Sequence, residues 1–312
     1  MTLLTETNNR IYDITELVTD LSWTDSLNNG ASVLEFSYLN TGILLNNGAP
    51  VRLQDDDGNG VFFGFTFKVN VDDKKKVKVK AYDSLRYCKA KDTIAVNGDT
   101  VSSLVKKMCA FFSFTPGGVA ETGYQLRPKI HTDKTWLDII YDGISDTLVS
   151  TQHYYTLRDE YGSIALRDLE DLQTGLVLGD GSLANGFSYE KSIDGDFYNQ
   201  VKLVKENEST GKADVYLVFD SESISKYGLL QYYEKLNKDS QGEKEKADAL
   251  LRLYNREAEK LSFKCIGDMR FRAGISVYAS VSDLKINRRV VVSKVTHKFL
   301  PVHTMDVEVM AS

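Results

Sequence analysis

Proline and cysteine are scarce in this chain. Its 312 residues include only 4 prolines and 3 cysteines. Because proline cannot donate a hydrogen bond within a sheet, few prolines suit a protein made largely of strands. Cys88, Cys109 and Cys265 are odd in number and far apart in the sequence, which argues against a disulfide framework. We therefore expect reduced thiols in a protein made in the cytosol.

Long apolar runs and an excess of positive charge are also missing. No segment approaches the roughly 18 apolar residues that a membrane-spanning helix needs, so we expect no direct membrane contact. The opening residues, MTLLTETNNR, lack the basic and apolar segments of a signal peptide. The formal net charge is −6 and the pI is about 5.4. Binding to phosphates needs clustered cations, so this balance argues against nucleic acid as a sequence-specific partner.

Aromatic residues are plentiful, and many stand in alternating segments. The chain has 17 tyrosines and 14 phenylalanines, residue types that favour strands. The clearest segment, VFFGFTFKVNVDDKKKVKVKA, runs from Val61 to Ala81. Its period of two predicts a long β-hairpin with a charged tip at Asp72–Lys76. The residues expected on its one buried face are Val61, Phe63, Phe65, Phe67, Val69, Val71, Val77, Val79 and Ala81.

The apolar spacing changes after residue 95. Helical spacing runs from Val101 to Phe112, and a second helix is predicted near Thr135, which with Asp138 resembles a capping box. A hairpin over residues 154–167 follows. We therefore predict a first region of strands over residues 1–95 and a small α/β region over 96–186, ending in the glycine-rich turn 179–186.

Residues 187–312 return mainly to strands, with one helix predicted over about 241–262. The apolar stripe assigned to that helix is Ala247, Leu250, Leu251, Tyr254, Ala258 and Leu261. The order GISVYA…RVVVSKVTHKF…MDVEVMA near the end is similar to GAPVRL…VFFGFTFKVN…KKVKVKA near the start. Duplication of one β unit and two unrelated β meanders both explain this echo. The predicted class is α+β, predominantly β, with two or three domains.

The segments that could carry chemistry have simpler structural explanations. Asp55–Gly60 resembles the front of a calcium loop, but position 12 is Thr66 instead of a glutamate, which favours a hairpin turn. Lys74–Lys76, Lys78 and Lys80 could form a basic patch for nucleic acid. Alternate spacing along a strand favours a solvated outer face or a sheet edge protected by lysine.

The remaining candidates are also weak. His131, His153, His297 and His303 are isolated, without the spacing of a metal site. Gly179, Gly181 and Gly186 miss the spacing of a dinucleotide-binding loop and indicate a turn. The sequence therefore predicts no catalytic residue, no cofactor and no metal ligand, and it favours a role in assembly or binding.

Taken in order, several segments resemble a known family. They are YDITELVTDLSW, VLEFSYL, VFFGFTF, KAYDSLRYCKAKDTIAVNGDTVSSLVKKMC, TGYQLRPKIHTDKTWLDIIYDGI, SIDGDFYNQVKLV, ISKYGLLQYYE and RAGISVYASVSDLKINRRVVVSKVTHKF. The chain resembles the XkdQ/YqbQ-type baseplate hub proteins of contractile phage tails and phage-tail-like bacteriocins. Each motif is short, and their order and spacing over nearly the whole chain carry the resemblance.

The resemblance implies a structural protein and not an enzyme. Residues 1–95 and 187–312 would each form a β-barrel related to the tail tube, with residues 96–186 between them. Three subunits would form a ring that adapts the sixfold tail tube to the threefold central spike. The implied partners are the tube or tube-initiator protein, the spike and the baseplate wedge proteins. Assembly in the bacterial cytoplasm would place the chain in the baseplate of a virion or tail-like particle.

Two questions remain open from the sequence. The hairpin tip, Asp72, Asp73, Lys74, Lys75 and Lys76, either contacts a neighbouring ring or subunit or is a free solvated turn. A cell-wall hydrolase that uses paired carboxylates, or a glycan-binding module of the tail tip, is the alternative to the hub.

Overall fold

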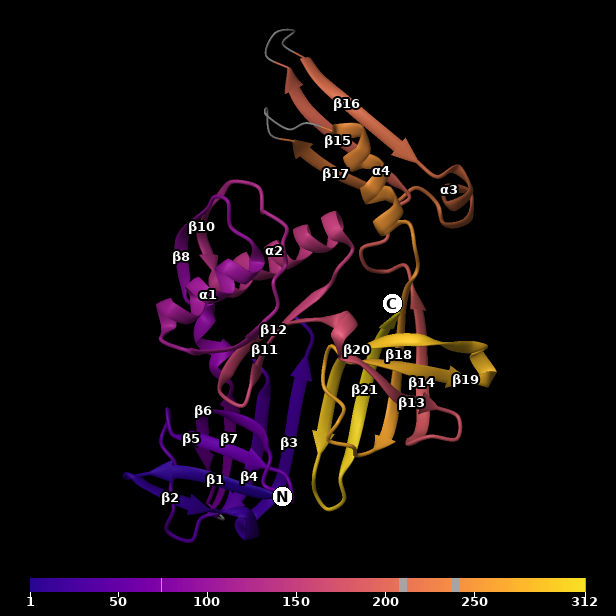
Figure 1. The fold of residues 1–312 in the computed structure, drawn as a ribbon. Helices are drawn as coiled ribbons and strands as arrows, with labels where there is room; N and C mark the ends of the chain where they lie inside the picture. Colours follow the sequence, from indigo (N-terminus) through magenta and orange to yellow (C-terminus); the bar gives the residue numbers. More distant parts are fainter. Residues whose placement is uncertain (74, 208–211, 237–241, 312) are drawn as a thin grey trace. The chain divides into compact units, whose positions relative to one another are not determined.

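The computed structural model describes residues 1–73, 75–207, 212–236 and 242–311. Strands dominate and helices are few, as predicted (Figure 1). The chain forms two compact units, one of residues 1–188 with 262–312 and the other of residues 189–261. Within the described ranges, no helix is both long enough and apolar enough to cross a membrane. Cys88, Cys109 and Cys265 are buried free cysteines, as expected.

The first seven strands form an antiparallel sheet in the order β3–β4–β7–β6–β5–β1–β2. Their bounds are β1 Thr2–Thr7, β2 Arg10–Asp13, β3 Val18–Ser26, β4 Val33–Leu39, β5 Pro50–Gln54, β6 Gly60–Val71 and β7 Lys76–Tyr82, with the short helix η1 at Thr15–Leu17. Alternate side chains of these strands share one core, in which Trp23, Phe36 and Tyr38 are among the largest fully buried residues.

The β6–β7 hairpin differs from its prediction in one respect. Thr66 pairs with Ala81 but the next pair is Lys68 with Lys80, so Phe67 is an extra residue, a β-bulge. An extra residue exchanges the two faces of the strand: Phe62 lies in the core before the bulge, and Val69 packs against it after the bulge. The phenylalanines assigned to that core face lie on the opposite one.

Those phenylalanines form an aromatic cluster of their own. Phe63 contacts Tyr161, and the rings of Phe65 and Phe67 lie 5.7 and 5.5 Å from Tyr87. The prediction of a single apolar face was therefore wrong for these three residues. Both faces of β6 carry apolar side chains. The alternation of residue types in the sequence therefore continues through the bulge and does not reveal it.

The middle region packs two helices against small sheets (Figure 1). Its elements are η2 Ser84–Lys89, β8 Lys91–Val96, α1 Val101–Phe112, β9 Thr115–Val119, β10 Lys129–Thr135, α2 Trp136–Thr151, β11 Tyr155–Glu160, β12 Ser163–Asp168 and η3 Leu169–Leu172. The Thr135–Asp138 capping box starts α2 as predicted, and Gln152 ends it in the left-handed conformation. The sheets are β10–β8 and β11–β12–β9.

A second group of strands follows in the order β14–β18–β21–β20–β19, and β20 also pairs with β3. The bounds are β13 Gln173–Gly179, β14 Ala184–Ser192, β18 Ala258–Ile266, β19 Ser276–Val281, β20 Ile286–Lys298 and β21 Thr304–Ala311, with η4 at Ser282–Leu284. This order matches β3–β4–β7–β6–β5, strand for strand.

The register of the two groups matches as well. Pro50 pairs with Phe65 across β5–β6, and the residues 226 positions later, Ser276 and Val291, pair across β19–β20. The bulge is repeated, because Val292 pairs with Val309 and Lys294 with Glu308, which leaves Ser293 as the extra residue. The sequence echo thus coincides with a shared backbone geometry down to one inserted residue.

Residues 189–261 form a small unit with its own core. It contains β15 Gln200–Asn207, β16 Lys212–Phe219, α3 Ser221–Tyr227, β17 Gln231–Leu236 and α4 Glu243–Tyr254. Val201, Leu203, Leu236 and Ala247 are buried between α4 and the sheet β16–β15–β17. The helix predicted over about 241–262 is shorter than expected. Asn255 ends α4, and residues 258–261 belong to β18, where Ala258 is exposed and Leu261 is buried.

Candidate interaction surfaces and polar clusters

The tip between β6 and β7 is a tight turn held by its own residues. The Lys76 amide donates to Asp72 Oδ1 at 2.8 Å, and the Asn40 amide donates to the Lys75 carbonyl at 2.9 Å. Lys75 has a φ of 60°, the left-handed conformation of a turn residue. Asp72, Asp73 and Lys75 are exposed, whereas Lys74 lies outside the described residues. The described tip residues therefore present exposed charges, and contact of the tip with a neighbour remains a prediction.

A polar hollow of about 350 Å³ lies on the outer face of β3, β4, β7 and β6. Lys68, Lys78 and Lys80 line it together with Asp20 and Glu35. Lys80 Nζ is 3.1 Å from Glu35 Oε1, and this hydrogen bond raises the pKa of Lys80. Because β7 lies between β4 and β6, Lys78 and Lys80 do not protect a sheet edge. They lie on a solvated outer face, which was the other explanation predicted for these lysines. This face carries charges of both signs.

The calcium-like segment is a turn, as predicted. Asp55 Oδ1 accepts hydrogen bonds from the amides of Asp57 and Asn59 at 3.0 and 2.8 Å. Gly58 has a φ of 83°, which fits the tight connection from β5 to β6. The turn predicted over Gly179–Gly186 is shorter: it lies between the end of β13 at Gly179 and the start of β14 at Ala184, and Ser182 donates to the Gly179 carbonyl.

A buried carboxylate in the AYDSLRY segment is one feature that sequence reasoning missed. Asp83 caps η2 by accepting from the Leu85 amide at 3.0 Å, and it also accepts from the amide and hydroxyl of Ser32. Burial, and then the nearby charge of Asp159, raise the pKa of Asp83 to about 8. Asp159 accepts from the Ser84 amide, so the two carboxyl groups join the first sheet to the middle region.

An ion pair extends this junction to the second group of strands. Arg272 Nε donates to Asp25 Oδ2 at 3.0 Å, and its Nη2 donates to the Asp159 carbonyl at 3.2 Å. Asp25 belongs to β3, Asp159 to β11, and Arg272 precedes β19. The arrangement fixes three parts of the larger unit against one another, which is a structural role for these buried charges.

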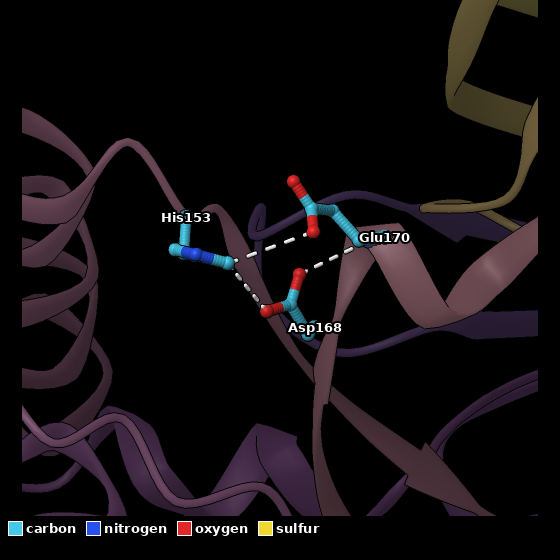
Figure 2. Close-up of side chains that lie close together, drawn as sticks. All are labelled: His153, Asp168 and Glu170. Atoms are coloured by element: carbon cyan, nitrogen blue, oxygen red, sulfur yellow. Dashed lines mark hydrogen bonds and ion pairs between the residues drawn. The ribbon is translucent and has the colours of Figure 1, made fainter.

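A second missed feature is a cluster on the middle region (Figure 2). His153 Nδ1 lies 3.0 Å from Asp168 Oδ2 and 3.9 Å from Glu170 Oε2. His153 follows α2, while Asp168 and Glu170 lie where β12 passes into η3. The histidine is isolated in sequence but not in the folded chain. Its partners are 15 and 17 residues away, too far for a spacing motif.

Comparison with known proteins identifies the family. The YqbQ-like family model matches residues 21–310. YqbQ and the phage-like element PBSX protein XkdQ, both of Bacillus subtilis (strain 168), are each 27% identical to this chain over 259 residues. Those residues cover 81% of this chain and 78% of each relative.

Solved structures share the fold. The 43 kDa tail protein of prophage MuSo2 from Shewanella oneidensis matches with a TM-score of 0.74 at 10% identity, over 100% of this chain and 98% of that one. The E. coli c3393 protein, described as a type VI secretion component structurally similar to the T4 tail proteins gp27 and gp5, matches with a TM-score of 0.58. This match has 10% identity and covers 95% of this chain and 73% of that one. The chain thus belongs to the YqbQ-like family and has the fold of phage tail proteins.

Proposed function

We propose that this chain is a structural baseplate hub protein of a contractile tail, in a phage or a phage-tail-like bacteriocin. Three copies form a ring that adapts the sixfold tail tube to the threefold central spike. The chain acts through its surfaces and not as an enzyme. Its partners are further copies of itself, the tube or tube-initiator protein, the spike and the baseplate wedge proteins.

The repeated strand order carries this proposal. The order β3–β4–β7–β6–β5 recurs as β14–β18–β21–β20–β19, with the same register between the last two strands and the same bulge. Two unrelated meanders have no reason to share an inserted residue at an equivalent position. We infer that each chain carries two copies of one barrel-forming unit. Three chains then present six similar units to the tube and a threefold arrangement to the spike.

The relatives support the same role. XkdQ is a protein of a phage-like element, and a structural match is a type VI secretion component described as similar to T4 tail proteins. The charged tip Asp72–Lys76 and the mixed-charge hollow on β3, β4, β7 and β6 are candidate contact surfaces for neighbouring rings or subunits. Assembly takes place in the bacterial cytoplasm, and the finished chain is part of the particle.

A pull-down of the tagged chain from the encoding bacterium during induction tests the proposal. We expect tube, spike and wedge proteins to be recovered with it in fixed ratios, and three copies of the chain for each intact particle. Recovery of intact tails that lack the chain would overturn the proposal that it is a hub protein. Zymography on cell walls and glycan binding by the purified chain would then test the hydrolase and the glycan-binding module.

A further inference from the structure

The His153 cluster has the composition and geometry of a metal site. It combines one imidazole nitrogen with two carboxylates, and the three candidate ligand atoms lie within 4.8 Å of one another. Bonds of about 2.0–2.2 Å to a divalent metal place neighbouring ligand atoms roughly 2.8–3.6 Å apart, depending on whether the site is octahedral or tetrahedral. The distance from His153 Nδ1 to Asp168 Oδ2 is 3.0 Å, and that to Glu170 Oε2 is 3.9 Å. The first distance already fits and the second needs a shift of less than 1 Å, while the two carboxylate oxygens lie within 4.8 Å of each other.

The backbone fixes two of the three ligands. The His153 amide donates to Thr151 Oγ1 at 3.2 Å, which ties the histidine to the last turn of α2. Asp168 Oδ1 accepts from the Glu170 amide at 3.0 Å as the N-cap of η3, so Oδ2 is directed toward the imidazole (Figure 2). Such a hydrogen bond to a ligating carboxylate orients it for an ion. The Glu170 side chain is 67% exposed and free to rotate the remaining distance.

The surroundings are strongly negative. Across the described ranges, no lysine or arginine forms an ion pair with Asp168 or Glu170, and the nearby Arg167 is paired with Glu160 at 2.6 Å. A cation at this position would therefore neutralise two carboxylates that no described lysine or arginine side chain pairs with.

We propose that His153, Asp168 and Glu170 bind one divalent transition-metal ion, with water in the remaining positions. An imidazole nitrogen with carboxylate oxygens suits Zn²⁺ and similar ions better than Ca²⁺, which prefers oxygen ligands alone. The ion joins the C-terminal end of α2 to the β12–η3 corner and so stabilises the middle region. This inference does not depend on the hub function.

Calorimetric titration of the full chain with ZnCl₂, after removal of metals with EDTA, tests the site. We expect about one Zn²⁺ per chain and a thermal midpoint that rises with Zn²⁺ concentration. His153→Gln and Asp168→Asn should each weaken binding by roughly tenfold or more, since ligand and orienting residues of metal sites have effects of this size. Glu170→Gln should weaken it less, because that side chain is the most exposed of the three.

The matched control is Asp57→Asn, which removes one negative charge, as Asp168→Asn does, from the exposed turn before β6. This variant should bind Zn²⁺ like the wild type, and CaCl₂ should not displace the ion. Absence of Zn²⁺ binding by the wild type, or undiminished binding by His153→Gln and Asp168→Asn, would show that the cluster is only an ion pair. Since the His153 side chain is 46% exposed, loss of the fold is not expected to confuse the result.

Discussion

The two long hairpins, β6–β7 and β20–β21, have the same backbone pairing and differ in the side chains that pack around it. Both have one extra residue at the equivalent position, Phe67 in the first and Ser293 in the second. The ring of Phe67 packs on Tyr82 and Tyr87, whereas the Ser293 hydroxyl donates to the Glu308 carbonyl at 3.1 Å. The bulge is thus held by aromatic packing in one hairpin and by a hydrogen bond in the other.

Two further positions show the same divergence. Gly64 of β6 corresponds to the buried Val290 of β20, and the half-exposed Val71 corresponds to the fully buried His297. The strand register and the bulge are the same in both hairpins although the side chains differ. Backbone pairing depends on geometry, whereas each core needs only side chains that fill its own space.

The largest expected effect comes from making the first hairpin like the second at Gly64. A Cβ atom there would lie 2.2 Å from the Tyr82 carbonyl oxygen, so Gly64→Val must displace backbone. We expect the free energy of unfolding to fall by about 3 kcal/mol or more, measured by chemical denaturation. The control is Gly186→Val, where nothing lies within 4 Å of the added Cβ, and it should change stability by less than about 0.5 kcal/mol. Equal effects of the two changes would contradict the close approach of β6 and β7.

The next largest effect is on the pH dependence of stability and concerns His297, which has no counterpart histidine in the first hairpin. Its Nε2 donates to the Phe271 carbonyl at 2.9 Å, which leaves Nδ1 to accept from His303 Nε2 at 3.0 Å. Burial lowers the pKa of His297 to about 4. The unfolded chain takes up the proton below about 6.5 and the native chain only below about 4, so stability falls as the pH drops through that window.

We expect His297 to account for a loss of about 2 kcal/mol between pH 7 and pH 5. His297→Val, which copies the first hairpin, should remove this part of the pH dependence in urea denaturation, although it lowers stability at both pH values. Val295→Ala is the control, because it removes a buried apolar side chain from the same strand and no titratable group, and it should leave the slope unchanged. An unaltered slope in His297→Val would assign the acid sensitivity to other groups.

An effect of similar size is expected at Asp83, which follows the first hairpin. Asp83→Ala leaves the amides of Ser32 and Leu85 without this acceptor and should cost about 2 kcal/mol in denaturation experiments. The pH dependence has the opposite sign to that of His297. Because the pKa of Asp83 is raised to about 8, its contribution is lost as the pH rises from about 4 through 8.

Asp83→Asn should therefore be least harmful relative to the wild type at the alkaline end of this range. A penalty for Asp83→Asn that grows with pH would contradict the raised pKa of this carboxyl group.

The smallest effect on stability is expected at the hairpin tip. Replacing Lys74, Lys75 and Lys76 by glutamate should change the free energy of unfolding by less than about 1 kcal/mol, because the described tip residues are mainly exposed. If the tip contacts a neighbouring ring, particle yield in the encoding bacterium should fall several-fold. The matched control replaces the exposed Lys134, Lys244 and Lys285 in the same way and should leave the yield unchanged. Normal assembly by the tip variant would leave the tip as a free turn.

Local patterns predicted most of the secondary structure. The α2 capping box, the hairpin of β11 and β12 and the turn at Asp55–Gly60 follow the sequence signals closely, whereas the turn predicted over Gly179–Gly186 ends where β14 begins at Ala184. Errors arose where a local pattern had two explanations. The period of two continued through the Phe67 bulge, and the helical stripe assigned to 241–262 continued into β18.

The sequence by itself determined the strand-rich class, the charged tip, the free cysteines and the family, because each depends on local order or composition. Only the tertiary structure decided the repeated register, the burial of Asp83 beside Asp159, and the meeting of His153 with Asp168 and Glu170. These features join residues that are distant along the chain. Their contacts are set by how strands pair and helices pack, and no spacing within a single segment records that.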